Sequence, residues 1–431
     1  MSAVLQVALD MMHLKRALEI GREAVEGGAD WVEAGTPLIK SEGALAIREL
    51  RKAFPTLTLV ADMKVMDVGA FEVEIAAKAG ADIVTVLALA DDATISESVL
   101  TARKYGAKVM VDLINVANKL ERAKEVEKLG AELVCLHVGV DEQMHGRTSP
   151  LQSVREIAAS LRIPVAVAGG ITQFTAKDYV EAGASVIIVG GSIIKAENVR
   201  EAAKAVKRAM LTGQVGAQEI SRKYGKEELF QAFTKVSTPN IADAQHKRGV
   251  ILGLVPHLRA GQKLVGRALT VQTAKGDWAK PVEAIDRASP GDVLVIDAGG
   301  SDVAVWGELA SLSAQGKGIT GVVVDGAVRD MDVIREIGFP CFCRYVVPHA
   351  GEPKGHGGIG LEIMCGGQLV RTGDWIIGDE SGLVVVPQES AVEVANRALD
   401  VLERENRIRE EIRRGGTLSS VLELEKWEQV R

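Results

Sequence analysis

The chain has 431 residues, of which 47% are hydrophobic, and a formal net charge of −7. This length exceeds one ordinary hydrophobic core and predicts two domains, while the acidic balance argues against nucleic acid or an anionic membrane as a partner. The N-terminus lacks a basic start and a cleavage site, and no apolar run is long enough to span a bilayer. Four cysteines are too few for a disulfide framework. We therefore expect a soluble cytoplasmic protein.

The first 213 residues alternate short apolar runs with amphipathic stretches of helical spacing. A weak repeat, Gly-Ala followed by Asp, Glu or Ser, closes a helix just before a strand at 28–30, 80–82, 130–132 and 183–185. Eight β-α units in so short a segment predict an α/β fold, a (β/α)₈ TIM barrel rather than an open doubly wound sheet. The predicted strands are Val4–Asp10, Asp30–Ala34, Leu57–Met63, Asp82–Ala88, Ala107–Leu113, Glu132–Val138, Pro164–Ala168 and Val186–Val189.

Polar side chains stand at nearly every predicted strand end except the fourth, which is where such barrels carry their chemistry. In Asp62-x-Lys64-x-x-Asp67, two carboxylates around one ammonium keep each other ionised, so Lys64 can meet an anion developing on a substrate; a structural salt bridge is the alternative. His137 is a candidate general base because histidine is the side-chain type whose ordinary pKa lies near neutral pH, although a lone histidine is more often structural. The candidates are Asp10, Glu33, Asp62, Lys64, Asp67, Asp112 and His137.

Two further patterns point to ligands. Glu33 and Asp62 offer hard oxygen atoms with no cysteine nearby, which suits Mg²⁺, with Mn²⁺ as a substitute, rather than zinc; hydrogen bonds to sugar hydroxyls are the alternative. The pairs Gly169-Gly170 and Gly190-Gly191 end the seventh and eighth strands, where barrels build phosphate sites from backbone N–H groups. The predicted substrate is therefore a sugar phosphate.

Together, these strand-end residues and the two glycine pairs resemble the orotidine-monophosphate-decarboxylase superfamily over essentially all of 1–213. Within it the pattern is most similar to the 3-hexulose-6-phosphate synthase branch. The nucleotide decarboxylase branch is metal-free and does not explain Glu33. The 3-keto-L-gulonate-6-phosphate decarboxylase branch shares Glu33 and the Asp/Lys motif, but it usually has an arginine just beyond the histidine. Here the next arginine after His137 is Arg147.

The resemblance implies reversible aldol addition of formaldehyde to D-ribulose 5-phosphate. His137 would remove a C1 proton, and Mg²⁺ on Glu33 and Asp62 would stabilise the enediolate with help from Lys64. Asp112 is expected among the catalytic residues. Asp10 and the paired glycines, Gly169, Gly170, Gly190 and Gly191, are expected to bind substrate. Relatives place the residue equivalent to Asp67 in the partner subunit's site, which implies a homodimer through the barrel or a higher homo-oligomer.

The second half has a different pattern. A polar linker is expected at 214–225, and 226–431 is predicted to be a smaller α/β domain that is not a second barrel and ends in a charged helical tail. The predicted strands are Lys263–Thr273, Val293–Ala298, Gly321–Asp325, Trp375–Gly378 and Leu383–Val386, with helices at Val305–Ala314 and Met331–Ile337.

Two features could carry chemistry in this half. A glycine-rich loop at 298–302 is expected to lead into a helix whose early amides, at Gly307, Glu308 and Leu309, could bind a carboxylate. Arg329 beside Asp330 follows an apolar strand, and Arg matches a carboxylate while Asp can hold Mg²⁺ through water, although Arg-Asp is also a common surface pair. Four tempting metal ligands fit no zinc spacing and are interpreted as core cysteines and surface histidines. They are Cys341, Cys343, His349 and His356.

These features, with Gly373-Asp374-Trp375 and the run at 378–387, resemble the family of ribonuclease-E regulator A and 4-hydroxy-4-methyl-2-oxoglutarate aldolase over about 235–390. The aldolases imply that Arg329 binds a pyruvate carboxylate and Asp330 a hydrated metal, with the amides of Gly307–Leu309 at the other end of the enolate. The expected ligand is then a 2-oxoacid. A binding or oligomerisation module without chemistry is the alternative.

Overall fold

The computed structural model describes residues 3–144, 150–216, 222–422 and 424. They divide into two compact units, Met1–Lys223 with Glu403–Arg431, and Tyr224–Leu402. Part of the predicted linker, 217–221, lies outside the described residues, as does Arg147. Within the described part of the chain, no helix combines the length and apolarity that a membrane crossing needs.

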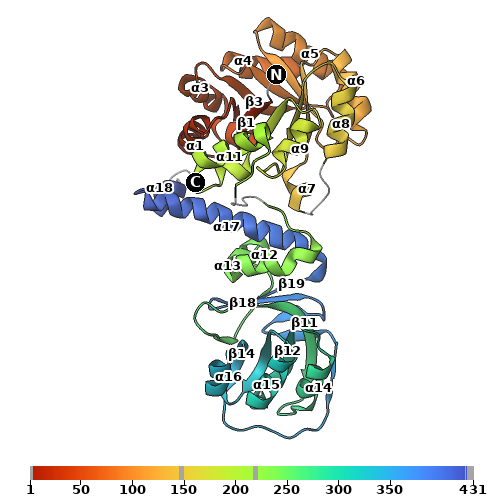
Figure 1. Cartoon of the computed structure of the whole chain (residues 1–431), viewed down its shortest axis with the longest axis vertical. Helices are drawn as coiled ribbons and strands as arrows, with labels where there is room; N and C mark the ends of the chain where they lie inside the picture. The colour runs from red at the N-terminus through yellow and green to blue at the C-terminus, as the bar shows by residue number, and fades with distance from the viewer. Residues whose placement is uncertain (1–2, 145–149, 217–221, 423, 425–431) are drawn as a thin grey trace, which may run out of the picture. The chain divides into compact units, whose positions relative to one another are not determined.

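The first unit is a closed barrel of eight parallel strands that neighbour one another in chain order, as predicted (Figure 1). Side chains alternate between its two cores: Val60 faces the barrel interior, while Leu59 and Ala61 pack towards the surrounding helices. The strands are β1 (Val4–Leu9), β2 (Trp31–Ala34), β3 (Thr58–Val65), β4 (Ile83–Leu87), β5 (Lys108–Asp112), β6 (Leu133–His137), β7 (Val165–Ala168) and β8 (Val186–Val189).

Amphipathic helices return the chain from each strand to the next. Most of them cover the barrel, and three short ones, α2, α7 and α10, follow strand ends. The helices are α1 (Leu14–Glu26), α2 (Thr36–Glu42), α3 (Ala44–Ala53), α4 (Gly69–Lys78), α5 (Asp92–Lys104), α6 (Lys119–Lys128), α7 (Val140–Met144), α8 (Leu151–Ser160), α9 (Ala176–Glu181), α10 (Gly191–Ile194) and α11 (Val199–Thr212).

The internal repeat has a structural role. Each of its glycines has a φ near +100°, the backbone conformation that the repeat predicts. Its acidic residue then accepts a hydrogen bond from an amide of the preceding strand: Asp30 from Leu5 N at 2.7 Å and Asp82 from Leu59 N at 2.7 Å. The third copy does the same through Glu132, which accepts from the amide of residue 109 at 2.9 Å. The repeat therefore ties neighbouring strands together at the N-terminal end of the barrel.

The second unit is built on a mixed sheet in the order β10-β14-β13-β12-β11-β18-β19-β9, with β15 paired to β11. Its strands are β9 (Val250–Ile251), β10 (Val255–His257), β11 (Leu264–Thr273), β12 (Asp292–Trp306), β13 (Gly321–Val328), β14 (Cys341–Val346), β15 (Gly357–Ile359), β16 (Ile363–Cys365), β17 (Gln368–Val370), β18 (Trp375–Asp379) and β19 (Gly382–Val386). Its helices include α12 (Leu229–Lys235), α13 (Thr238–Ala244), α14 (Ala279–Arg287), α15 (Glu308–Gly316) and α16 (Met331–Ile337).

Two local expectations for this unit were wrong. The glycine-rich segment 298–302 is part of β12 instead of a loop, because its pairing to β13 continues through register shifts while Gly299 and Gly300 take positive φ values of 62° and 68°. For the same reason the helix predicted from Val305 begins only at Glu308.

The predicted helical tail is α17 (Ala391–Arg413) and α18 (Leu418–Leu422), with the expected break at Gly415-Gly416. Its apolar residues Ala395, Ala398 and Leu399 are buried in the core of the second unit. Residues from Glu403 onward belong to the predicted second domain, whereas in the structure they group with the barrel. Arg407, which is almost fully buried, pairs with Glu411 at 2.9 Å and with Glu23 of α1 at 3.8 Å.

Candidate active site

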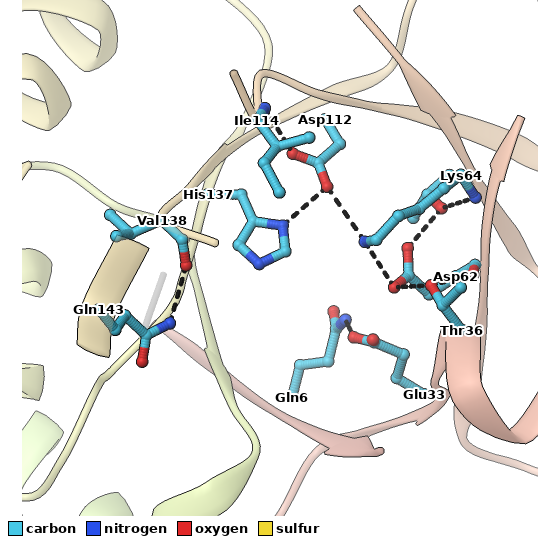
Figure 2. A network of polar contacts seen from close by, with 11 residues as sticks. Gln6, Glu33, Thr36, Asp62, Lys64, Asp112, Ile114, His137, Val138 and Gln143 are labelled. Carbon is cyan, nitrogen blue, oxygen red and sulfur yellow. Dashed lines mark hydrogen bonds and ion pairs between the residues drawn. The ribbon is translucent and has the colours of Figure 1, made fainter. Parts of the chain in front are cut away.

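The C-terminal ends of the barrel strands bring five of the predicted residues into one polar network. Figure 2 shows Glu33 from β2, Asp62 and Lys64 from β3, Asp112 from β5 and His137 from β6 facing the same space. This arrangement follows from the parallel barrel, because all eight strands end on the same rim.

A continuous chain of contacts runs through the network. His137 Nδ1 lies 2.8 Å from Asp112 Oδ2, and Lys64 Nζ lies 3.4 Å from that same oxygen. Lys64 Nζ also donates to Asp62 Oδ2 at 2.7 Å. Both carboxylates are buried, while the lysine and histidine are partly exposed to the mouth of the barrel. Buried acids thus hold Lys64 Nζ and His137 Nδ1, while both side chains remain partly exposed to solvent.

The contacts among these side chains set the protonation states of Asp112 and Lys64. Burial raises the pKa of Asp112, but the hydrogen bond from His137 and the charges of His137 and Lys64 bring it below its usual value. An ionised Asp112 accepts the Nδ1 proton of His137, which leaves the Nε2 lone pair free to accept another proton. Burial lowers the pKa of Lys64, but Asp62 and Asp112 outweigh it and raise the pKa above its usual value. Lys64 is therefore a permanent ammonium.

Glu33 is a buried acid of the mouth. Burial, followed by the charges of Asp62 and Asp10, raises its pKa well above the usual value. Gln6 Nε2 donates to Glu33 Oε2, while Gln6 Oε1 is buried without a hydrogen-bond partner among the described residues. Two close carboxylates and an unpartnered amide oxygen favour a cation. Among the described residues no group of three or more His, Cys, Asp or Glu side chains is placed to hold a metal, so a cation here would need further oxygens from water or substrate.

The paired glycines follow β7 and β8 as predicted. Gly169 and Gly170 have positive φ values of 102° and 66°, and a side chain at Gly169 would collide with the carbonyl of Val138. A Cβ added at Gly190 would lie 3.2 Å from Asp10 Oδ2, so the glycine leaves room for this carboxylate. Gly191 begins α10. The glycines therefore let the backbone at the ends of β7 and β8 pass close to the Val138 carbonyl and the Asp10 carboxylate.

Asp67 is not in the network. Its side chain is exposed, and its Oδ1 accepts the amide of Val68 at 2.7 Å. The structure places it beyond the end of β3, and its expected role in a partner's site stays a prediction.

Three side chains that the sequence did not single out support the acids. Thr36 Oγ1 donates to Asp62 Oδ2 at 2.7 Å, Thr85 Oγ1 donates to Asp62 Oδ1 at 2.7 Å, and Gln6 holds Glu33 (Figure 2 shows Thr36 and Gln6). No polar residue was expected at the exit of the fourth strand, and Thr85 stands instead inside β4. A signal was present, because Thr85 is the only polar residue of Ile83–Leu87 and lies at an inward-facing position.

The second unit brings its five predicted residues together at the ends of β12 and β13. Arg329 Nε lies 3.3 Å from Asp330 Oδ2, and the amide of Glu308 donates to the same oxygen at 3.3 Å. Gly307 and Leu309 flank that amide at the start of α15, and Asp330 stands in the left-handed conformation just before α16. Both charged side chains are open to solvent, so a small anion could reach them.

The four side chains of this unit that the sequence analysis considered as metal ligands differ in burial. Cys341 and Cys343 are fully buried in β14, whereas His349 and His356 are exposed. The interpretation as core cysteines and surface histidines is confirmed.

Comparison with known proteins matches each half to a different family. Residues 3–206 match the orotidine 5′-phosphate decarboxylase / HUMPS family, and residues 238–385 match the Aldolase/RraA family, described as RraA-like. The 3-hexulose-6-phosphate synthase of Bacillus subtilis (strain 168) is 40% identical over 211 residues, which cover 48% of this chain and 99% of the relative. The chain belongs to the 3-hexulose-6-phosphate synthase family. This makes the barrel an enzyme of the aldolase or lyase type.

Other members of the synthase family match the same half. The 3-hexulose-6-phosphate synthase of Mycobacterium gastri is 42% identical over 206 residues, or 48% of this chain and 99% of the relative. A crystal structure of a 3-hexulose-6-phosphate synthase is 42% identical and covers 48% of this chain and 99% of its own, with a TM-score of 0.46. Because these synthases are matched almost in full by the first half, the RraA-like unit is an addition to the family's usual length.

Proposed function

We propose that the barrel catalyses the reversible aldol addition of formaldehyde to D-ribulose 5-phosphate. The observation that carries the proposal is the contact chain from His137 through Asp112 to Lys64 and Asp62, in a barrel about 40% identical to named synthases. These contacts support the proposal because they bring an imidazole, with Nδ1 held by Asp112, and a permanent ammonium to one mouth. Deprotonating a carbon beside a carbonyl needs both.

In this proposal His137 Nε2 accepts the proton from C1 of the ketose. Asp112 holds the imidazole in the required tautomer and stabilises the imidazolium that forms. The Lys64 ammonium lies beside the negative charge that develops on the sugar oxygens. The resulting enediolate carbon then attacks the carbonyl carbon of formaldehyde, and a proton is returned to the new alkoxide. In the reverse direction the same residues release formaldehyde.

Glu33 and Asp62 fit Mg²⁺ as protein ligands, with Mn²⁺ as a substitute. Burial and the charges of Asp62 and Asp10 raise the pKa of Glu33, so the positive charge of a bound cation would stabilise its ionised form, and its carboxylate is a hard oxygen donor. When bound, the ion would supply that charge to the ketone and hydroxyl oxygens of the sugar. Asp10 and the glycine pairs at 169–170 and 190–191 would bind the substrate, with backbone N–H groups facing its phosphate.

The alternative reaction is decarboxylation of 3-keto-L-gulonate 6-phosphate. The same mouth would serve it, but the position just after His137 carries Val138 and Gly139 instead of an arginine. For this reason the aldol reaction is preferred.

Formaldehyde consumption by the full chain tests the proposal. We expect consumption that requires both ribulose 5-phosphate and Mg²⁺, stops with a chelator, and falls at least about 100-fold in Lys64→Ala, which loses the cation beside the developing charge. Lys52→Ala, which removes an exposed lysine paired with Glu49, should behave as wild type. Release of CO₂ from 3-keto-L-gulonate 6-phosphate without formaldehyde consumption would select the alternative.

For the second unit we propose a Mg²⁺-dependent 2-oxoacid aldolase or decarboxylase. Arg329 would hold the carboxylate of the 2-oxoacid, Asp330 a hydrated cation, and the amides at Gly307, Glu308 and Leu309 the other end of the enolate. The supporting observation is that Asp330 Oδ2 lies between Arg329 Nε and the Glu308 amide, 3.3 Å from each.

Pyruvate release from a 2-oxoacid is the matching assay. It should be lost in Arg329→Ala and kept in Arg371→Ala, which removes another exposed arginine of the same unit, paired with Glu362. No turnover on any 2-oxoacid, together with a stable complex with a protein partner, would instead make this unit a binding module.

We also propose a homo-oligomer in the cytoplasm, without a nucleic-acid or membrane partner. The cytoplasmic location is supported by four free, buried cysteines, which suit a reducing compartment.

A further inference from the structure

Strand β3 carries extra residues exactly where it delivers its charged side chains. Ala61 pairs with Val84 of β4, but the next pair is Val65 with Val86. Three residues, Asp62 to Lys64, therefore stand opposite the single residue Thr85. We call this segment, 62–64, the β3 bulge. Bulges interrupt the backbone ladder and change the direction of side chains, and they are common beside active sites.

The bulge leaves one amide for a side chain to satisfy. Lys64 has a φ of +49°, a left-handed conformation that a lysine rarely adopts, and its amide donates to Thr85 Oγ1 at 3.1 Å. The same hydroxyl donates its proton to Asp62 Oδ1 at 2.7 Å. Thr85 is 3% exposed, so water does not replace either bond.

We infer that Thr85 is a positioning residue that holds Asp62 and Lys64 in their working geometry. The inference rests on the proposed synthase function of this mouth. One hydroxyl accepts from the backbone of Lys64 and donates to the carboxylate of Asp62, so it fixes both ends of the β3 bulge at once. Figure 2 shows the result: Lys64 and Asp62 face each other and Asp112.

Thr36 does not duplicate this role. It donates to Asp62 Oδ2, the oxygen that also accepts from Lys64 Nζ, and to the carbonyl of Asp62. Among the described residues, Thr85 is the partner that hydrogen-bonds both Asp62 Oδ1 and the Lys64 amide. Without its hydroxyl, the carboxylate can rotate and a partly buried N–H is left unpaired, which is costly for the bulge.

The test compares Thr85→Val, which keeps the shape and removes the hydroxyl, with Thr85→Ser, which keeps the hydroxyl. In the full chain, Thr85→Val should lower kcat for formaldehyde addition by about 10- to 100-fold and leave KM for ribulose 5-phosphate within about threefold, because the glycine pairs are untouched. Thr85→Ser should stay within about threefold of wild type. Ser98→Ala, which removes another buried barrel hydroxyl, one that bonds to the carbonyl of Thr94, should change neither constant.

Hydrogen–deuterium exchange provides a readout that does not depend on activity. A peptide spanning 62–66 should exchange faster in Thr85→Val than in wild type or Thr85→Ser, because the Lys64 amide loses its acceptor. If Thr85→Val folds poorly, Thr85→Ala against Thr85→Ser repeats the comparison, since that pair differs by one hydroxyl.

Two results would overturn the inference: a kcat in Thr85→Val within twofold of wild type, or a Thr85→Ser variant as impaired as Thr85→Val. A wild-type protein without formaldehyde addition would reject the proposed function instead. In that case the exchange experiment still decides about Thr85, and unchanged exchange in Thr85→Val would reject its hold on Lys64.

Discussion

Asp112 is the residue that joins His137 and Lys64 at the barrel mouth. Its Oδ1 accepts the amide of Ile114 at 2.9 Å, and its Oδ2 is shared between His137 and Lys64. With both oxygens occupied, the carboxylate cannot rotate without losing a contact. It thereby fixes which nitrogen of His137 carries the proton and how far the ammonium stands from it.

Replacing the Asp112 carboxylate by an amide of the same shape removes its negative charge and keeps a side chain that can still hydrogen-bond His137. In Asp112→Asn the side chain can present an N–H group to His137 Nδ1, which favours the tautomer whose Nε2 is already protonated. We expect kcat for formaldehyde addition to fall by about 10²- to 10⁴-fold with a much smaller change in KM. Asp92→Asn, at an exposed pair with Arg122, is the matched control and should retain full activity. A loss of less than tenfold in Asp112→Asn would show that His137 does not depend on this partner.

At this scale the sequence predicts residues that end strands and misses those that support them. Glu33, Asp112 and His137 could be placed on one rim because parallel strands of a barrel end together. Gln6 carried the same signal as Thr85, a polar residue inside the otherwise apolar strand Val4–Leu9, but its role is recognisable only once Glu33 is beside it. The role of Thr85 depends on the β3 bulge, which two strands define jointly and neither sequence run contains.

At the scale of helices and strands, the repeat of Gly-Ala followed by an acidic residue links neighbouring strands of the barrel. Asp82 accepts the Leu59 amide and also pairs with Arg51 of α3, and Asp30 combines the Leu5 amide with Lys207 of α11 in the same way. The fourth copy ends in serine, and within the described ranges Ser185 forms backbone hydrogen bonds to Val4 and Val165 of the neighbouring strands and no side-chain tie. The side-chain tie therefore exists where the repeat is acidic.

Removing one tie should destabilise the barrel measurably. Asp82→Ala leaves the Leu59 amide without its charged acceptor and should lower the free energy of unfolding by about 1–2 kcal/mol, seen as a lower urea midpoint at unchanged m-value. The ion pair to Arg51 adds little, because Asp82 is half exposed. Asp92→Ala removes an exposed ion pair without a strand amide and should change the midpoint much less. Equal effects of the two substitutions would mean that the strand amide contributes nothing.

Strand positions were predictable because alternating burial and β-α spacing are local. All eight barrel strands lie within a few residues of their predicted limits, and α16 begins and ends as predicted. The failure at β12 has a tertiary cause. Gly299-Gly300 has the composition of a turn, but β13 continues to pair on one side with Ser301 and Ala304, so the strand persists through the irregularity.

On the scale of the whole molecule, the two units use one principle. In each, the charged side chains stand at the carboxyl ends of parallel strands: β2, β3, β5 and β6 in the barrel, and β12 and β13 in the second unit. Both proposed reactions also pass through an enolate-type anion that needs a cation beside it. The sequence could predict two units because their strand patterns differ. It could not assign the residues from Glu403 to the barrel, since that grouping depends on contacts such as Arg407 with Glu23, far apart in the chain.

The surface around Asp67 leads to a prediction about assembly. Met66, Val68 and Phe71 next to it are all more than half exposed, an apolar surface suited to a second copy of the barrel. If Asp67 completes the partner's site while Lys64 acts in its own, a dimer of one Lys64→Ala chain and one Asp67→Ala chain contains one intact site.

Co-expression of the two inactive variants tests this arrangement. Random pairing makes about half of the dimers mixed, each with one working site of two, so the preparation should recover about one quarter of wild-type formaldehyde addition. Each variant expressed alone should stay inactive. The control is co-expression of Lys64→Ala with His137→Ala, two residues that are expected to act in the same chain's site. Its mixed dimers contain one site without the lysine and one without the histidine, so this preparation should be no more active than the separate variants. A preparation of Lys64→Ala with Asp67→Ala that is no more active than its parts would place Asp67 in the same chain's site as Lys64, and an active Asp67→Ala variant would place it outside the site of either chain.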